Sequence, residues 1–302
     1  MQIWDHKIVL PSATTPWPLL PFGCVHEDDP GHHEELWAEF LDTVVKTPLC
    51  KAIGLGDYFS FSRQTYRAHI RSYTGDENSQ RELDKMCEDR ARAFYKTHLK
   101  KIEGKLLGLA EGNHHWTFMD GTTDTQLLCK LAKVPYLGKA SGHNFHLSTS
   151  GGNIAVLQML VHHGDWSSGA MTIGGDVNSV ERKAGAWDAD IYCFAHTHRK
   201  IAWKDPVFGW PKQKRGAAPL DIKERPRVYI RAGCFVRGYV RSCVTYAEAK
   251  LLKPTDLGWV TLHTKFSQPY NPGKWKTQSE KGLSRSAASH HNALRHTFTV
   301  TY

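Results

Sequence analysis

Histidines, one cysteine, one aspartate and one asparagine gather in five short segments of the chain. These segments are CVH at 24–26, GD at 56–57, GNHH at 112–115, HHG at 162–164 and AHTH at 195–198. Imidazole, carboxylate and amide oxygen suit borderline divalent cations such as zinc, manganese and iron. A carboxylate shared by two such ions can hold them about 3.5–4 Å apart, a spacing used to hydrolyse phosphate esters. The residue types therefore predict a two-metal phosphoesterase centre.

Each of the five segments follows an apolar run that predicts a β-strand. The runs are LLPFG before Cys24, CKAIGL before Asp57, KLLGLAE before Asn113, AVLQMLV before His162 and IYCF before His196. In an open α/β sheet, ligands bind in the crevice beyond the carboxyl ends of the strands, so the five segments would meet in one place. A single GD or HxH is common in unrelated loops, and the prediction depends on all five in this order.

The ordered set resembles the calcineurin-like metallophosphoesterase superfamily. That family's pattern is DxH, GD, GNH followed by Asp or Glu, a His before Gly, and GHxH. The resemblance covers roughly residues 19–200 and extends to about 264, where the chain is also similar to phage-associated members. It implies an α/β fold in which a two-sheet β-sandwich is flanked by helices, in four layers α/β/β/α.

The resemblance also implies two divalent cations, Mn, Zn or Fe, and their ligands. The first ion would be held by Cys24, His26, Asp57 and His198. The second would be held by Asp57 as the bridge and by Asn113, His163 and His196. His114 matches the family's general acid or transition-state stabiliser, which is not a ligand. Water activated by the ions would attack phosphorus in line with the leaving oxygen.

Three residues depart from the family pattern. Cys24 replaces the first Asp, and a thiolate keeps the negative charge but is a softer ligand that favours zinc or iron. Cys24 could instead be a small buried strand residue that binds nothing. His115 replaces the acidic residue after GNH. In the family pattern that acidic residue would orient His114, so whether His114 protonates the leaving group is an open question for this chain. Ala195 replaces a Gly, a change of little consequence.

Two neighbouring histidines compete for one ligand position. Adjacent strand residues point to opposite faces, so only one of the two histidines is expected to reach the metal. The family places this ligand directly before Gly, which favours His163 as the ligand. His162 would then support a ligand or pack in the strand. Asp165 could orient a ligand histidine through its other ring nitrogen, or it could be a loop aspartate in water.

Composition predicts a soluble enzyme in a reducing compartment. A chain of 302 residues can form one domain, and no run of about 18 apolar residues suggests a membrane helix or membrane partner. The start, MQIWDHKIVL, lacks the features of a signal peptide, and the seven cysteines show no CxxC. We expect a cytoplasmic protein, in the host cytoplasm if phage-encoded.

The expected organisation is one domain over residues 1–265 and a polar, flexible tail over 266–302, whose final HTFTVTY alternates like a strand. A helix is expected to begin at Asp29, which Pro30 follows, and to end before Pro48, with Val45 among the residues that face inward. Further helices are expected over 81–105, 122–133 and 178–188.

The net charge of +9 favours a polyanionic partner, nucleic acid or a nucleotide. Arg63, Arg67 and Arg71 recur every four residues after the GD segment and would form a basic helix face with Tyr58 among the interleaved aromatics, able to hold phosphates and stack bases. A solvated helix face is the alternative. The basic insertion at about 203–227 is a candidate substrate rim, with a disordered insertion as its alternative.

The sequence thus predicts a metal-dependent hydrolase of phosphate esters, with a phosphodiesterase or nuclease favoured by the basic charge. A phosphomonoesterase acting on phosphoproteins or small metabolites is the alternative enzyme. Cys24 and His115 also allow a catalytically weakened metalloprotein that binds nucleic acid or a partner.

Overall fold

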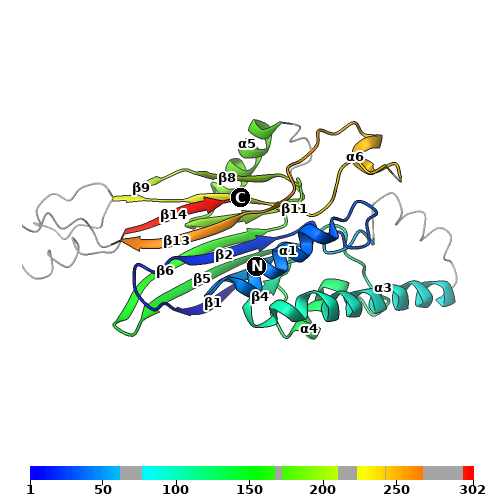
Figure 1. Ribbon diagram of the computed structural model, residues 1–302, viewed down its shortest axis with the longest axis horizontal. Helices are drawn as coiled ribbons and strands as arrows, with labels where there is room; N and C mark the ends of the chain where they lie inside the picture. Colours follow the sequence, from blue (N-terminus) through cyan, green and yellow to red (C-terminus); the bar gives the residue numbers. More distant parts are fainter. Residues whose placement is uncertain (62–76, 167–171, 210–222, 242, 268–294) are drawn as a thin grey trace, which may run out of the picture.

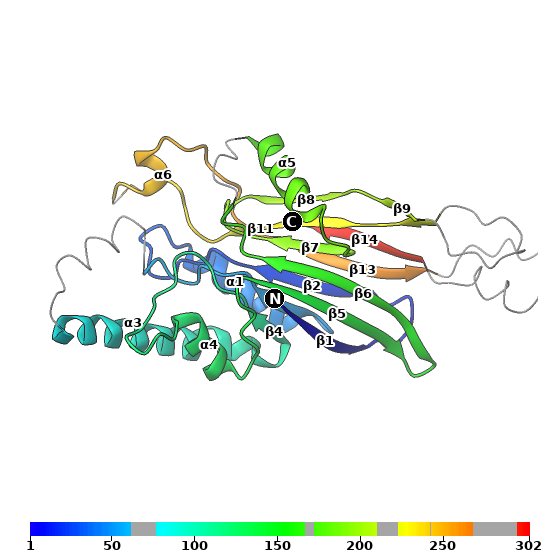
Figure 2. The ribbon, with the colours of Figure 1, turned by 180° about the vertical axis from the view of Figure 1, so that it is seen from behind.

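Two β-sheets lie face to face in the computed structural model, with helices on both outer sides (Figure 1). The structure describes residues 1–61, 77–166, 172–209, 223–241, 243–267 and 295–302. Figure 2 shows the same layers from behind, with α1, α3 and α4 on one side and α5 on the other. The arrangement places the strand ends of both sheets along a common edge.

The larger sheet has seven strands within the described residues. In spatial order they are β1 (Gln2–Val9), β5 (Ala140–Thr149), β6 (Gly152–His162), β7 (Ile191–Phe194), β11 (Val228–Cys234) and β12 (Gly258–Trp259), with β8 (Lys200–Lys204) also paired to β11. Strands β6, β7 and β11 run parallel, so they end at the same edge of the sheet. The HHG and AHTH segments leave from the ends of β6 and β7.

The second sheet has five strands in the described part of the chain. Their order is β14 (Arg295–Thr301), β13 (Thr261–Ser267), β2 (Trp17–Phe22), β3 (Lys51–Gly54) and β4 (Leu106–Leu109). Strands β2, β3 and β4 are parallel neighbours, and the CVH, GD and GNHH segments follow them. Their carboxyl ends therefore bring these three segments together.

Strand residues alternate between separate apolar cores. Leu19 of β2 and Ile191 of β7 lie in the core between the two sheets. Leu20, next to Leu19, packs toward the helices that cover the five-stranded sheet, and Tyr192, next to Ile191, packs toward α5. Because successive strand side chains point to opposite faces, these fully apolar strands are those of sheets covered on both sides.

The helices form the two outer layers. The five-stranded sheet is covered by α1 (Glu34–Lys46), α3 (Glu77–Thr97), a 3₁₀ helix (Leu99–Lys105) and α4 (Asp124–Ala132). The seven-stranded sheet is covered by α5 (Ile173–Ala184), and the short α6 (Tyr246–Ala249) follows β11. The predicted α/β/β/α layering is confirmed.

Helix boundaries differ from the sequence prediction at several ends. The first helix begins at Glu34 instead of Asp29, because the Asp29 carboxylate accepts a hydrogen bond from the Gly31 N–H and closes a turn first. Val45, expected to face inward, is 47% exposed. The helix expected over 178–188 begins at Ile173, where the Thr172 hydroxyl caps it. The helix expected over 81–105 starts earlier and is followed by the separate 3₁₀ helix.

The sheet extends past the domain boundary expected at residue 265. Strand β13 runs to Ser267, and β14 pairs with it along its length, so HTFTVTY completes the edge of the five-stranded sheet. Alternating apolar residues, such as Phe298, let this strand bury one face. Residues 268–294, the polar part of the expected tail, lie outside the described residues.

Within the expected insertion at 203–227, β9 (Val207–Gly209) and β10 (Lys223–Arg225) form an antiparallel two-stranded ribbon. None of the described helices is both long and apolar enough to cross a membrane.

Candidate metal centre

The five predicted segments meet at the carboxyl edge of the two sheets. Backbone hydrogen bonds connect them directly: the Cys24 N–H donates to the Gly56 carbonyl at 2.9 Å, and the His26 N–H donates to the Asp57 carbonyl at 3.1 Å. In the other sheet, the Ala195 N–H donates to the His163 carbonyl at 2.9 Å. The segments therefore occupy one site, as the order of motifs predicted.

Five of the predicted ligands adopt left-handed backbone conformations. The φ angles are 49° at Cys24, 46° at His26, 56° at Asp57, 72° at His196 and 59° at His198. For residues other than glycine this region is sparsely populated and costs about 1–3 kcal/mol each. Such conformations persist only where the surroundings enforce them, and they cluster at functional sites. Their concentration at this edge of the sheets makes it the candidate functional site.

Glycines permit the close approach of the GD and GNHH segments. Gly56 has a φ of 100°, and a Cβ added there would lie 2.5 Å from the Gly112 nitrogen. A Cβ on Gly112 would lie 1.9 Å from Asp57 Oδ1. Any side chain at Gly112 would therefore displace the Asp57 carboxylate, which explains the glycine before Asn113.

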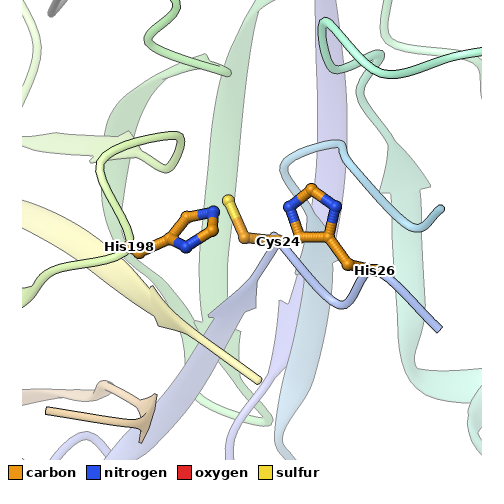
Figure 3. Close-up of side chains that lie close together, drawn as sticks. All are labelled: Cys24, His26 and His198. Carbon is orange, nitrogen blue, oxygen red and sulfur yellow. The ribbon is translucent and has the colours of Figure 1, made fainter. Parts of the chain in front are cut away.

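One group of potential ligands comprises Cys24, His26 and His198, and we call it the thiol group. Their ligand atoms lie within 4.8 Å of one another. Figure 3 shows Cys24 between the two imidazole rings, with His198 reaching in from the segment after β7. His26 Nε2 is buried and has no hydrogen-bond partner in the described structure. A buried nitrogen without a partner is costly, and a bound cation would satisfy it.

A second group comprises Asp57, His163 and His196, and we call it the carboxylate group. Asp57 Oδ2 lies 3.0 Å from His163 Nε2 of its own group and 3.9 Å from His26 Nε2 of the thiol group. The carboxylate therefore faces imidazoles of both groups. Asn113 Oδ1 lies 2.9 Å from both His163 Nε2 and His196 Nδ1. The oxygens of Asp57 and Asn113 therefore lie within hydrogen-bond distance of the same imidazole nitrogen, His163 Nε2. A cation could bind among these atoms by displacing the protons that they share.

Burial sets the charge state of the thiol group. It raises the pKa of the Cys24 thiol well above its usual value, with the Asp57 charge acting in the same direction. The His196 backbone N–H donates to Cys24 Sγ at 3.3 Å, which partly opposes this. Burial lowers the pKa of His26 well below its usual value and that of His198 to about 4. Both imidazoles are therefore neutral at pH 7 and can offer a lone pair to a metal.

The carboxylate group carries a charged pair. Burial acts to raise the pKa of Asp57, but the charge and hydrogen bond of His163 outweigh it and hold the pKa well below its usual value. Burial acts to lower the pKa of His163, and Asp57 reverses this and raises it. Burial lowers the pKa of His196 to about 4. Asp57 is thus ionised and partly neutralised by a proton on His163.

His114 lies beside the ligands without being one of them. Its backbone N–H donates to Asp57 Oδ1 at 2.9 Å, and its ring lies edge-on to His26 with centroids 5.3 Å apart. His114 Nδ1 has no hydrogen-bond partner among the described residues. The residue as a whole is partly exposed.

Two supports for the ligands were not predicted from the sequence. The Ser60 hydroxyl lies 2.7 Å from His26 Nδ1, and the Leu55 carbonyl lies 2.7 Å from His163 Nδ1. A carbonyl can only accept, so His163 Nδ1 carries the proton and Nε2 faces the ligand side. A backbone carbonyl has no sequence signal, and Ser60 belongs to no motif that would single it out.

The structure gives the contacts of Asp165 and His162, for each of which the sequence left two roles open. Asp165 is 3.5 Å from Lys139 Nζ, and the Leu55 carbonyl, not Asp165, lies against His163 Nδ1. His162 Nδ1 accepts from the Gly164 N–H, and its ring packs on Trp166 with centroids 4.2 Å apart. The two adjacent histidines therefore face different surroundings, as strand alternation predicted.

His115, at the position where the family pattern has an acidic residue, lies close to Gly112 and Glu111. Its Nδ1 lies 3.0 Å from the Gly112 carbonyl and 3.7 Å from Glu111 Oε1. Glu111 also accepts hydrogen bonds from the hydroxyls of Thr123 and Tyr136. His115 therefore belongs to a polar cluster next to the GNHH segment.

The prediction that Tyr58 binds substrate is wrong. Tyr58 is 1% exposed, and its hydroxyl donates to the Ala110 carbonyl at 3.0 Å and accepts from the Gly56 N–H at 3.3 Å. It fills the space above Gly54, where a Cβ would lie 2.3 Å from the Tyr58 hydroxyl. A ring buried in this way cannot stack on a base. Arg63, Arg67 and Arg71 lie outside the described residues.

The insertion expected to form a substrate rim extends away from the metal centre where it is described. Strand β8 starts just after His198 and runs antiparallel to β11, so the β9–β10 ribbon beyond it lies at the opposite end of the sheet (Figure 1). The basic stretch at 212–215 lies outside the described residues. The described part of this segment therefore does not border the ligands.

The chain is weakly similar to solved structures that share little sequence with it. A single mutant of Vps29 from Entamoeba histolytica aligns over 94% of this chain and 99% of its own, with 10% identity and a TM-score of 0.39. A conserved uncharacterized protein from Streptococcus pneumoniae, a predicted phosphoesterase, aligns over 85% and 86%, with 10% identity and a TM-score of 0.35. Vacuolar protein sorting 29 from Cryptosporidium parvum aligns over 95% and 98%, with 11% identity and a TM-score of 0.34.

No protein-family model matches the chain, and no curated protein matches it either. At such low similarity the solved structures carry no functional conclusion. The function proposed next therefore rests on the residues of this chain.

Proposed function

We propose that this protein hydrolyses phosphate esters with the help of two divalent cations. The observation that supports this most directly is the position of Asp57, an ionised carboxylate of the carboxylate group whose Oδ2 also lies 3.9 Å from His26 Nε2 of the thiol group. A shared carboxylate is the feature that two-metal sites use to hold their ions at a fixed spacing. The ordered motifs and their resemblance to calcineurin-like metallophosphoesterases support the same reaction class.

The donor atoms fit zinc, manganese or iron. Cys24, His26 and His198 would hold one ion, and His163, His196 and Asn113 the other, with Asp57 shared. One thiol, four imidazoles, one carboxylate and one amide form a borderline set, softer on the side of Cys24. Neutral imidazoles and the partnerless nitrogen of His26 suit a cation better than a proton. Bound ions would polarise the phosphoryl group and lower the pKa of water.

The chain's own residues would supply the remaining functions. Asp57 stays ionised and provides negative charge between the ions. His114, anchored through its backbone to Asp57 and partly exposed, is placed to protonate the leaving oxygen or to stabilise charge in the transition state. A proton donor must come within hydrogen-bond reach of that oxygen, and His114 is adjacent to the ligands without being engaged by them.

For the substrate we propose a phosphodiester in a nucleic acid or nucleotide. The net charge of +9 supports a polyanionic substrate. Of the expected substrate-binding residues, Tyr58 no longer contributes, and the three arginines at 63, 67 and 71 lie outside the described residues. A phosphomonoesterase remains the alternative enzyme.

One observation favours a metalloprotein with weakened catalysis as a second candidate. His114 Nδ1 has no hydrogen-bond partner in the described structure, and His115 Nδ1 lies 3.0 Å from the Gly112 carbonyl. The acidic residue that the resemblance leads us to expect after GNH, which would orient His114, is replaced here by His115. Such a protein would bind ions, and nucleic acid or a partner, yet turn over slowly.

A metal-loaded preparation separates these possibilities. Hydrolysis of bis-p-nitrophenyl phosphate is compared with that of p-nitrophenyl phosphate, and then single- and double-stranded DNA and RNA are tested. We expect the diester to be preferred and His114→Ala to reduce its hydrolysis on the order of 10²-fold. The matched control is His146→Ala, because His146 lies on β5, where it contacts Asp5 outside the site. Unchanged activity in His114→Ala would contradict the proposed role of His114.

A further inference from the structure

A buried ion pair lies next to the AHTH segment, between two elements that carry none of the predicted ligands. Arg231 on β11 donates from Nη2 to Asp176 Oδ1 on α5 at 2.5 Å. Each residue is 1% exposed. Burying a charged pair has a large desolvation cost, and well-packed apolar replacements are often neutral or stabilising. Stability alone is therefore a weak reason for this pair.

Both partners of the pair also bind the AHTH segment. Arg231 Nη1 donates to the Ala195 carbonyl at 2.7 Å. The Thr197 hydroxyl donates to Asp176 Oδ2 at 2.9 Å. Ala195 precedes His196, and Thr197 separates His196 from His198. The pair thus anchors the backbone on both sides of His196, one ligand of the carboxylate group, and immediately before His198 of the thiol group.

The same arginine packs against the HHG segment. A Cβ added to Gly164 would lie 2.6 Å from Arg231 Nη1 and 3.1 Å from the Ala195 carbonyl. The Ala195 N–H in turn donates to the His163 carbonyl at 2.9 Å. Arg231 therefore lies where the segments carrying three of the predicted ligands meet.

The backbone held by this network is strained. His196 and His198 have φ angles of 72° and 59°, in the left-handed region. Strained conformations relax unless several contacts enforce them. Arg231 and Asp176 provide two such contacts, and Arg199 Nε adds a third interaction 3.8 Å from Asp176 Oδ2.

We propose that Arg231, Asp176 and Thr197 are positioning residues, which hold the AHTH backbone so that His196 and His198 stay directed at the two ligand groups. The inference rests on the proposed function only in that it requires cations to bind there. It assigns a role to three residues that hold the ligand loop through the Ala195 carbonyl and the Thr197 hydroxyl. Their loss would weaken cation binding even where the fold is intact.

Thr197→Val tests this with the smallest change. Valine keeps the shape and both buried charges but removes the hydroxyl that joins the loop to Asp176. Thr197→Ser is the matched control, because it retains the hydroxyl. The measurement is calorimetric titration of chelator-treated protein with Zn²⁺ and, separately, Mn²⁺, together with the thermal midpoint of the metal-free protein.

We expect Thr197→Val to weaken binding about 10- to 100-fold, the range seen when groups supporting metal ligands are removed. Thr197→Ser should stay close to wild type, and the metal-free midpoints of both should match. Wild-type affinity in Thr197→Val would overturn the inference. If wild-type protein binds neither ion, the proposed function fails, which is a distinguishable result.

A double variant, Arg231→Met with Asp176→Leu, replaces the pair by apolar side chains of similar size. It should unfold at a temperature close to wild type, because the desolvation cost disappears with the charges. Its affinity for Zn²⁺ should nevertheless fall at least as far as that of Thr197→Val. A folded double variant with wild-type affinity would contradict the positioning role, and Thr197→Val decides the question if the double variant does not fold.

Discussion

The thiol group and the carboxylate group are built from similar loops but differ in charge. Both rely on residues with left-handed backbone conformations that follow parallel strands. In the thiol group, burial keeps the Cys24 thiol protonated and the imidazoles of His26 and His198 neutral. In the carboxylate group, Asp57 is ionised and His163 holds a proton against it. Equal geometry therefore does not imply equal affinity for a cation.

Because their charge states differ, the two groups would release different protons when a cation binds. A cation entering the thiol group must displace the Cys24 proton, because only the thiolate is a good ligand. A cation entering the carboxylate group meets an existing negative charge and displaces the proton of His163. Asp57 connects the two events, because its Oδ2 lies within 4 Å of an imidazole from each group.

The largest expected effect is that of Asp57→Asn, which removes the charge shared by both groups. We expect phosphodiester hydrolysis to fall on the order of 10²–10³-fold and binding of both ions to weaken. Activity assays and metal titration on the same preparation provide the measurement. The control is Asp5→Asn, since Asp5 is an exposed residue of β1 that contacts His146 and Asn144. Loss of one ion alone would show that Asp57 is not shared.

Cys24→Asp sharpens the contrast by replacing the soft thiol with a hard carboxylate. We expect the ratio of Zn²⁺ to Mn²⁺ affinity to fall roughly tenfold or more, since thiolates favour zinc and carboxylates favour manganese. Cys24→Ser, which offers neither, should weaken both. Competition titrations with the two ions measure the ratio. An unchanged ratio would mean that Cys24 is a buried core residue and not a ligand.

The contributions of His198 and His163 to the pH dependence of the metal-free protein should differ in sign. The pKa of folded His198 is about 4, below its usual value of 6.5, so an unfolded chain binds more protons in that interval and stability falls as pH drops from 6.5 to 4. The pKa of folded His163 is raised, so its stabilisation is complete below pH 6.5 and is lost as pH rises through the folded value.

Urea unfolding of two variants tests these signs. His198→Gln should reduce the acid sensitivity by on the order of 1 kcal/mol per pH unit. His163→Gln should destabilise more at pH 6 than at pH 9. If both variants respond to pH in the same direction, the two groups do not differ in charge as described.

The smallest effect is expected from Tyr58→Phe, outside both groups. Loss of the hydrogen bond to the Ala110 carbonyl should lower the free energy of unfolding by about 1 kcal/mol. Activity toward single-stranded DNA should be unchanged, because the ring is buried. A selective loss of DNA hydrolysis would restore Tyr58 as a substrate contact.

The sequence could predict the fold class and which segments meet, because the segments follow strand-like runs in a recognisable order. It could not predict Tyr58 correctly, since an aromatic residue next to a ligand looks alike whether it faces solvent or fills the space over Gly54. The first helix also begins later than the Asp–Pro signal predicted, because a local turn uses Asp29 first.

The supports of the ligands were hidden for a different reason. The Leu55 carbonyl that contacts His163 is a backbone atom of the kind that every residue carries, and Ser60, whose hydroxyl contacts His26, belongs to no recognisable motif. Arg231 and Asp176 lie far from the AHTH segment in sequence and reach it only through the packing of α5 and β11. Such contacts depend on tertiary structure, and no spacing of residues along the chain predicts them.

The most direct test of the central claim is anomalous scattering from crystals of this protein soaked in Zn²⁺ or Mn²⁺. The account predicts two peaks, one at Cys24, His26 and His198 and one at His163, His196 and Asn113, with Asp57 between them. A single peak away from Asp57, or no peak at these residues, would contradict it.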